Sequence, residues 1–250
     1  MQIELKGVFI LVTKNPRFPI ENKLLAALPD EDYQRLLPDL ELVELPLRQA
    51  LYEPEEPIKH VYFLNQGICS IVYIMEDGST VEVGIVGNEG MVGIPVFLGG
   101  DTTTTSAFMQ VAGTGMRVKA VRLKAEFDLG GSLQKSLLRY TQALLTQITH
   151  AGVSNRLNTV EERLARWLLT VADLTQSDEF RLTQEFIAQM LGVRRSGVTV
   201  AAGILSQAGM IRYSRGKITI LNREDLKATA GENYRMIKTE FSRLLDTERA

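Results

Sequence analysis

The feature that most constrains this chain is a run of 37 residues, from Phe186 to Asn222, that contains no aspartate and no glutamate. The cationic side chains in this run are Arg194, Arg195, Arg212, Arg215 and Lys217. Its first part has the pattern of a short helix, a sharp turn at Gly192 and a second helix that opens with two arginines. A helix-turn-helix without nearby negative charge suits a polyanion, so we predict that this segment binds double-stranded DNA.

The same pattern assigns roles to individual residues. Thr183 is expected to cap the first helix, and the second helix presents its N-terminal end, which is the end that enters the major groove. An arginine there can donate two hydrogen bonds to guanine. Residues 210–220 predict a hairpin with a basic tip, a wing suited to phosphate contacts. The predicted DNA-binding residues are Thr183, Arg194, Arg195, Ser196, Gly197, Thr199, Ser214, Arg215 and Lys217.

An arginine pair alone would more often belong to an ordinary solvated helix face. The charge distribution supports the DNA-binding interpretation instead. Residues 1–131 hold 11 Lys/Arg and 18 Asp/Glu, whereas residues 181–250 hold 12 and 7. The acidic first half and the basic last part indicate two domains with different partners, and 250 residues suffice for two cores.

The composition excludes several other classes. Cys69 is the only cysteine, so neither an intrachain disulfide nor a thiolate-ligated metal site is expected, and no cofactor or metal is predicted. The single cysteine fits the reducing cytoplasm, and no apolar run reaches the length of a membrane span, so no membrane partner is expected. Neither Cys69 nor the two histidines, His60 and His150, lies in a nucleophile–base motif, so no enzyme is expected.

Hydrophobic periodicity divides the chain into segments. Residues 1–21, with a short apolar run at 7–12, are expected to form an N-terminal extension. Residues 22–44 have a helical pattern, capped by Asn22, and residues 45–123 form short β-rich runs that predict a sandwich or roll. A capping box at Thr159 and Glu162 then opens another helix, whose Trp167 is expected to lie in the core.

A long helix is predicted after Gly130-Gly131. Apolar and small residues follow one another along it at alternating steps of four and three, which is typical of a helix-pairing seam. The alternative is that the helix packs on its own β-domain, but the length of the seam favours a homodimer. The predicted dimer-interface residues are Leu137, Thr141, Leu144, Ile148, Ala151 and Asn155.

Together these segments resemble the Crp/Fnr family of bacterial transcription regulators over about residues 22–250. The resemblance rests on His60–Phe63, Gly67, Glu76-Asp77-Gly78, Gly90–Gly93, the long helix and Leu191–Arg195. It implies an α+β fold with a cyclic-nucleotide-binding-like β-roll at 22–131, a dimerisation helix at 132–158 and a winged helix-turn-helix at 159–250. It also implies a homodimer on a palindromic site, RNA polymerase as a partner and a small-molecule effector in the roll.

The sequence departs from the family pattern in its effector pocket. Members that respond to cyclic AMP carry a Gly-Glu pair and an Arg-Ser pair, whereas this chain has Gly93-Ile94 and Thr105-Ser106. A cyclic nucleotide phosphate would be buried there without a cation, which is costly. We therefore expect that cyclic AMP is not the effector, and that Gly93, Ile94, Thr105 and Ser106 form a degenerate pocket. The alternative is a cyclic-nucleotide-responsive regulator with an atypical pocket.

The second helix of the helix-turn-helix, the recognition helix, also departs from the family pattern. Where relatives of the catabolite activator protein have Arg-Glu-Thr-Val-x-Arg, this chain has Arg195 to Val200, with Ser196 and Val200 in place of the Glu and the second Arg. Its half-site should therefore differ from theirs. The iron–sulfur sensing of the Fnr branch needs several cysteines, so the single Cys69 excludes it. Haem sensing would need an axial ligand, and the two histidines, His60 and His150, are expected to be structural.

Overall fold

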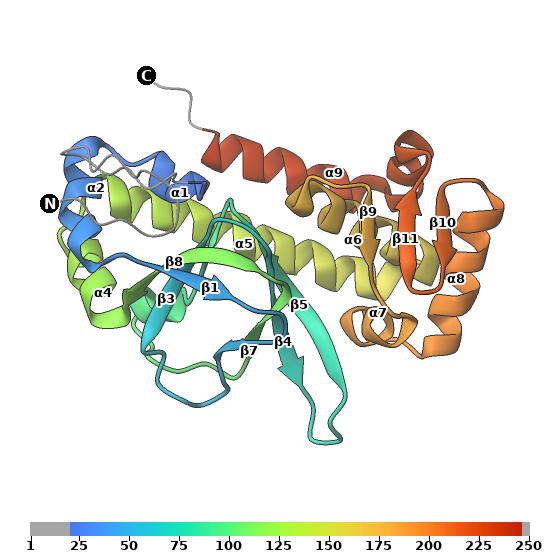
Figure 1. Ribbon diagram of the computed structural model, residues 1–250, viewed down its shortest axis with the longest axis horizontal. Helices are drawn as coiled ribbons and strands as arrows, with labels where there is room; N and C mark the ends of the chain where they lie inside the picture. Colours follow the sequence, from blue (N-terminus) through green and yellow to red (C-terminus); the bar gives the residue numbers. More distant parts are fainter. Residues whose placement is uncertain (1–20, 247–250) are drawn as a thin grey trace, which may run out of the picture.

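The computed structural model describes residues 21–246, and the chain divides into an N-terminal roll, a long central helix and a C-terminal unit (Figure 1). The predicted extension over residues 1–21 lies outside the described residues, apart from Glu21. No helix in the described part of the chain is long and apolar enough to cross a membrane.

The predicted β-roll is present and consists of two four-stranded antiparallel sheets. Their orders are β1-β8-β3-β6 and β2-β7-β4-β5. The strands are β1 (Glu41–Leu45), β2 (Ala50–Tyr52), β3 (His60–Leu64), β4 (Ile68–Ile74), β5 (Thr80–Val86), β6 (Met91–Val92), β7 (Ser106–Val111) and β8 (Gly113–Lys119). Two helices, α3 (Pro95–Leu98) and α4 (Ala120–Asp128), complete the roll. Its core contains apolar residues of both sheets such as Phe63 and Met109, both fully buried.

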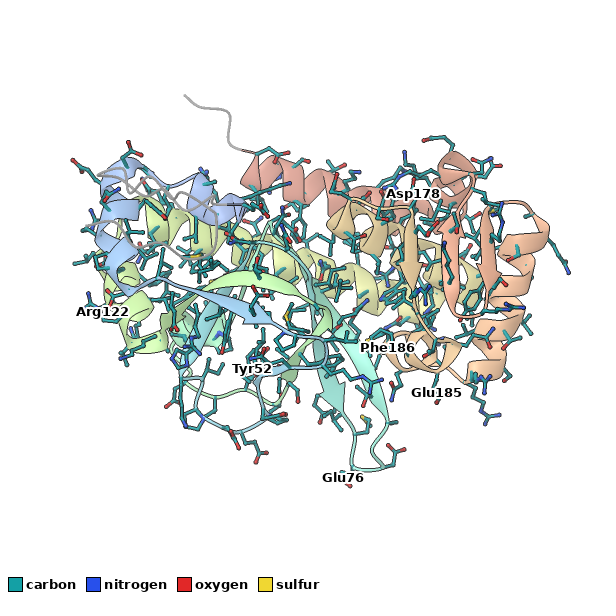
Figure 2. All side chains as sticks on the ribbon, in the orientation of Figure 1. Tyr52, Glu76, Arg122, Asp178, Glu185 and Phe186 are labelled. Carbon is teal, nitrogen blue, oxygen red and sulfur yellow. The ribbon has the colours of Figure 1, made fainter. Side chains whose placement is uncertain are left out.

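The hairpin predicted at Glu76-Asp77-Gly78 is confirmed between β4 and β5. The Asp77 carboxylate accepts a 2.8 Å hydrogen bond from the backbone N–H of Ser79, and Gly78 adopts a φ of +81°, which only glycine enters without strain. Glu76 lies at the tip of this hairpin, which projects away from the body of the molecule (Figure 2).

The N-terminal helical prediction is correct only in part. Asn22 caps α1 (Lys23–Ala26) as expected, accepting from the backbone N–H groups of Leu24 and Leu25, and α2 (Asp30–Leu36) follows. A 3₁₀ turn, η1 (Leu37–Asp39), ends the helical region. Residues 41–44, predicted helical, instead belong to β1, because the segment from Glu41 to Leu45 pairs in register with Arg117 to Gly113 of β8.

The predicted long helix is α5 (Gly131–Leu157), and it extends from the roll along the C-terminal unit (Figure 1). Gly130 and Gly131 both have positive φ, at +80° and +83°, which allows the chain to reverse between α4 and α5. The Tyr140 hydroxyl donates to the carbonyl of Met91 at 3.0 Å, and this bond fixes the first half of α5 to the roll.

The C-terminal unit is a helical bundle with a small three-stranded sheet. Its elements are α6 (Val160–Thr175), β9 (Glu179–Arg181), α7 (Gln184–Leu191), α8 (Arg195–Gln207), β10 (Ile211–Ser214), β11 (Lys217–Ile220) and α9 (Arg223–Leu245). The capping box is confirmed, because Thr159 Oγ1 accepts from the Glu162 N–H and the Glu162 carboxylate accepts from the Thr159 N–H. Trp167 is buried as predicted. Three roll residues, Ile68, Val72 and Ile85, join the apolar cluster of this unit.

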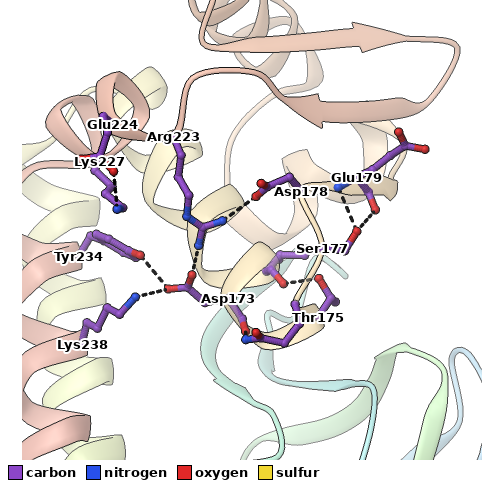
Figure 3. Close-up of polar contacts among 12 residues, drawn as sticks. Asp173, Thr175, Ser177, Asp178, Glu179, Arg223, Glu224, Lys227, Tyr234 and Lys238 are labelled. Carbon is purple, nitrogen blue, oxygen red and sulfur yellow. Dashed lines mark hydrogen bonds and ion pairs between the residues drawn. The ribbon is translucent and has the colours of Figure 1, made fainter.

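Helix α9 links the C-terminal unit back to the roll. It bends at Gly231, whose φ of +70° interrupts the helical backbone, and Asp173 of α6 anchors it on both sides of this point (Figure 3). The Asp173 carboxylate accepts from the Tyr234 hydroxyl at 2.7 Å and pairs with Arg223 and Lys238. Near the end of α9, Leu244 is buried and lies with Leu245 beside Leu24 of α1.

Candidate nucleic-acid interface

Helices α7 and α8 form the predicted helix-turn-helix. Thr183 caps α7 by accepting a 3.1 Å hydrogen bond from the Phe186 N–H, and Gly192 ends it with a φ of +60°. A Cβ on Gly192 would stand 3.0 Å from a methyl of Val81 on β5, so the turn also lies against the roll. The buried residues Ile187, Leu191, Val198, Ala201 and Leu205 hold the two helices together.

The N-terminal end of α8 is exposed. Arg194 is the N-cap residue and makes no side-chain cap hydrogen bond, whereas the Gly197 N–H donates to the Arg194 carbonyl at 2.9 Å. The positive end of the helix dipole is thus not covered by a capping side chain. Arg194, Arg195, Ser196 and Thr199 are exposed, and Gly197 is half-buried. Among residues 21–246, no ion pair involves Arg194 or Arg195. Both cations are thus free to meet a polyanion.

The predicted wing is the hairpin of β10 and β11. Its tip, Arg215-Gly216, takes positive φ at both residues, +51° and +75°, as a two-residue hairpin turn requires. The Tyr213 hydroxyl donates to the carbonyl of Leu182 at 3.0 Å and so ties the wing to the start of α7. Ser214 and Arg215 are exposed.

Lys217 differs from its expected setting. It forms an ion pair with Glu179 of β9, which pairs with β11 in the same sheet. Glu179 lies outside the acid-free run in sequence, so inspection of that run alone could not reveal the pair. The predicted contact of Lys217 with a DNA phosphate would therefore have to replace its ion pair with Glu179.

A cleft of about 620 Å³ separates α7, α8 and the wing. It is lined by Thr183, Gln184, Glu185, Arg195, Tyr213, Arg215 and Gly216. The structure thus brings together three of the predicted DNA-binding residues, Thr183, Arg195 and Arg215. Sequence reasoning missed Gln184, whose Oε1 accepts a 2.9 Å hydrogen bond from the Thr199 hydroxyl across the two helices. The exposed acid Glu185 lies at the first turn of α7, beside Phe186 (Figure 2).

The predicted effector-pocket residues all belong to the roll, and the hydroxyls of Thr105 and Ser106 face neighbouring side chains. Gly93 has a φ of +109°, and Ile94 packs against the core of the roll. The Thr105 hydroxyl lies 3.1 Å from that of Thr103 and 3.5 Å from the Tyr52 hydroxyl. Burial raises the pKa of Tyr52 to about 12, so its hydroxyl stays neutral.

Ser106, the other predicted pocket residue, donates a 3.2 Å hydrogen bond to the carboxylate of Glu53. Two cations of α4 in the same roll are paired elsewhere: Arg122 pairs with Asp39 at 2.9 Å, and Lys124 pairs with Asp128 at 2.7 Å. The charged group hydrogen-bonded to Ser106 is thus a carboxylate and not a cation.

The predicted dimer seam on α5 requires a correction. Leu137 and Leu144 are 0% and 1% exposed, and Thr141 is also buried, because these residues pack within the same chain. They leave no surface for a second chain. Ile148 and Ala151 are half-buried, and Asn155 is exposed. The exposed apolar residues of α5 each follow a predicted seam residue by one or two positions. They are Leu138, Leu145, Val153 and Leu157.

The two histidines have structural settings. His60 lies on β3, where burial lowers the pKa of its imidazole. His150 Nδ1 lies 2.8 Å from Oδ1 of Asn233 and links α5 to α9.

Two domain models match the chain. A Crp-like helix-turn-helix domain matches residues 162–229, and a cyclic nucleotide-binding domain matches residues 42–127. The global nitrogen regulator of Synechocystis sp. is 24% identical over 183 residues, which cover 70% of this chain and 81% of that protein.

Solved structures show the same fold. A CRP-family transcriptional regulator from Thermus thermophilus is 18% identical with a TM-score of 0.64, over 76% of this chain and 97% of that one. FixK2 from Bradyrhizobium japonicum is 17% identical with a TM-score of 0.64, over 77% of this chain and 98% of that one. The two domain matches, in this order along the chain, show a transcription regulator with a DNA-binding helix-turn-helix. The chain belongs to the Crp/Fnr family.

Proposed function

We propose that the protein acts as a homodimer in the cytoplasm and binds a palindromic DNA site through one copy of α8 in each half-site. The observation that carries this proposal is the free, exposed Arg194–Arg195 pair at the start of α8, flanked by the basic tip of the wing. Arg195 lines the cleft between α7, α8 and the wing, so we assign it to base contact and Arg215 to phosphate.

The dimer interface is proposed on the exposed face of α5. Leu138 and Leu145 are 47% and 56% exposed, and they lie seven residues apart, the spacing of one heptad. Gly152 continues this spacing, and a Cβ there would meet nothing within 4 Å, so a partner helix could approach closely. Compared with the sequence-based seam, the proposed interface is displaced by one residue. Half-exposed Ile148 and Ala151 would flank it.

The proposed effector is a small molecule other than cyclic AMP. Ile94 and Thr105 supply neither a carboxylate for a ribose nor a guanidinium for a phosphate, and the Glu53 carboxylate beside Ser106 would repel the phosphate. The match of residues 42–127 to a cyclic nucleotide-binding domain supports the alternative, a cyclic nucleotide held in an atypical pocket. By family resemblance, the proposed protein partner is RNA polymerase.

Three measurements test these proposals separately. Repeated selection of random DNA duplexes by the full-length protein should enrich a palindrome, and unselective binding would contradict sequence-specific recognition. Arg195→Ala should weaken binding to the enriched site by about 1–3 kcal/mol and relax its sequence preference. Calorimetry with cyclic AMP should show no micromolar binding; such binding, with tighter binding of the enriched site, would establish the alternative.

A further inference from the structure

The outward face of the recognition helix carries no charge. Val198, Ala201 and Leu205 are buried, and they fix which side of α8 faces the core. At about 100° per residue, the opposite side consists of Ser196, Val200, Gly203 and Gln207. Arg195 and Thr199 lie on one flank of this side. The residues that point most directly away from the protein are therefore small, apolar or neutral.

Val200 lies at the centre of this face and is 62% exposed. A valine at such a position gains nothing from packing within the chain. In the major groove, the one apolar feature of a base edge is the C5-methyl group of thymine, which side chains contact without a hydrogen bond. Val200 is exposed about one turn from the N-terminus of α8. Its aliphatic side chain can contact this methyl group, but it can form no hydrogen bond with a base.

Gly203 lies one turn further along the same face. A Cβ built on Gly203 would meet no atom within 4 Å, and its φ lies outside the positive region, so neither crowding nor backbone conformation within the chain requires glycine. Glycine is among the least favourable residues inside a helix. A requirement from outside the chain, namely close approach of the helix backbone to a bound molecule, accounts for it.

We infer that α8 lies deep in the major groove through this uncharged face, with Val200 against a thymine methyl group and the backbone at Gly203 against the DNA. The inference rests on the proposed binding of DNA through α8, and it adds a specificity determinant that forms no hydrogen bond. Arg195, on the flank, would read a neighbouring base pair. Each half-site should then contain a thymine whose methyl group is required.

The test uses the full-length protein and the palindrome obtained by selection. Each thymine of the half-site is replaced in turn by deoxyuridine, which removes the methyl group and leaves the hydrogen-bonding groups unchanged. For one thymine per half-site, wild-type binding should weaken about fourfold, which corresponds to about 0.8 kcal/mol for one buried methyl group. Val200→Ala should bind the thymine and deoxyuridine duplexes equally. Val121→Ala, which truncates an exposed valine on α4, should retain the wild-type difference.

A second variant tests the close approach. Gly203→Ala should keep or raise the Tm of the free protein, because alanine favours the helix, yet weaken binding to the selected site about tenfold or more. A lowered Tm, or wild-type affinity at an unchanged Tm, would overturn the role of Gly203. The absence of any methyl-dependent thymine, or a methyl effect that persists in Val200→Ala, would overturn the role of Val200. Failure to select any site would instead refute the proposed function.

Discussion

The indole Nε1–H of Trp167 donates a 2.8 Å hydrogen bond to the carboxylate of Glu82. Trp167 belongs to α6 and Glu82 to β5, so this bond joins the C-terminal unit to the roll. The Ser70 hydroxyl lies 2.7 Å from the same carboxylate and 2.6 Å from Oε1 of Gln110. Burial raises the pKa of Glu82 to about 7, although the bonds from Ser70 and Trp167 oppose the shift.

We predict that the fluorescence of Trp167 titrates with an apparent pKa near 7. Trp167 is the only tryptophan of the chain, so the signal has a single source. Ionisation of Glu82 places a negative charge beside the indole and should change its emission. Glu82→Gln should abolish the titration. Glu89→Gln, which removes another carboxyl whose pKa burial raises, should leave it in place. A titration that persists in Glu82→Gln would contradict the assignment.

The same carboxyl should make stability depend on pH. The pKa of Glu82 rises from 4.5 in the unfolded chain to about 7 in the folded one, so between these values the folded state binds more protons. Its contribution to stability is therefore fully present below pH 4.5 and is lost as pH rises to 7. The total change is on the order of 3 kcal/mol. Urea unfolding at pH 5 and pH 8 should show a smaller stability difference for Glu82→Gln than for wild type.

Glu179→Gln should tighten DNA binding. The substitution releases Lys217 from its ion pair and removes a negative charge from the sheet that carries the wing. With one more phosphate contact, the slope of log affinity against log salt should steepen by about 0.9. Gel shifts at several salt concentrations measure this slope. Lys217→Ala combined with Glu179→Gln should cancel the gain in slope, and an equal gain in that double variant would show that Lys217 makes no phosphate contact.

Charges at two adjacent positions of α5 should have opposite consequences. Leu144→Glu places a carboxylate in the core of the chain and should prevent stable folding. Leu145→Glu places it on the exposed face, so the chain should fold but remain monomeric. Circular dichroism measures the folding, and light scattering measures the mass. A folded Leu145→Glu dimer would locate the interface elsewhere.

These adjacent leucines also show how far the sequence could be interpreted. Capping and turn chemistry are local, so Thr159 with Glu162, Thr183, Gly192 and the Asp77 hairpin could be predicted from a few neighbouring residues. Helix α5, however, carries two apolar stripes one residue apart, and a period of 3.6 does not indicate which stripe faces the roll. That choice depends on partners that are distant in sequence.

The interactions between units depend on distant partners as well. Glu82 and Trp167 are 85 residues apart, and each looks ordinary in its own strand or helix. The ion pair of Lys217 with Glu179 depends on the pairing of β11 with β9, a short strand without a clear periodic pattern. In the DNA-binding site, the sequence shows Val200 only as a departure from the family pattern. Its exposure could not be predicted, because it depends on which side of α8 packs against the rest of the chain.

The position of α9 has a consequence for the biosynthesis of the protein. Leu244 and Leu245 of α9 lie beside Leu24 of α1, which the ribosome makes much earlier than α9. The roll can start to fold while later segments are still being synthesised, but this apolar surface stays uncovered until α9 has left the ribosome. A nascent chain stalled before residue 240 should therefore be a client for chaperones that bind exposed apolar surfaces.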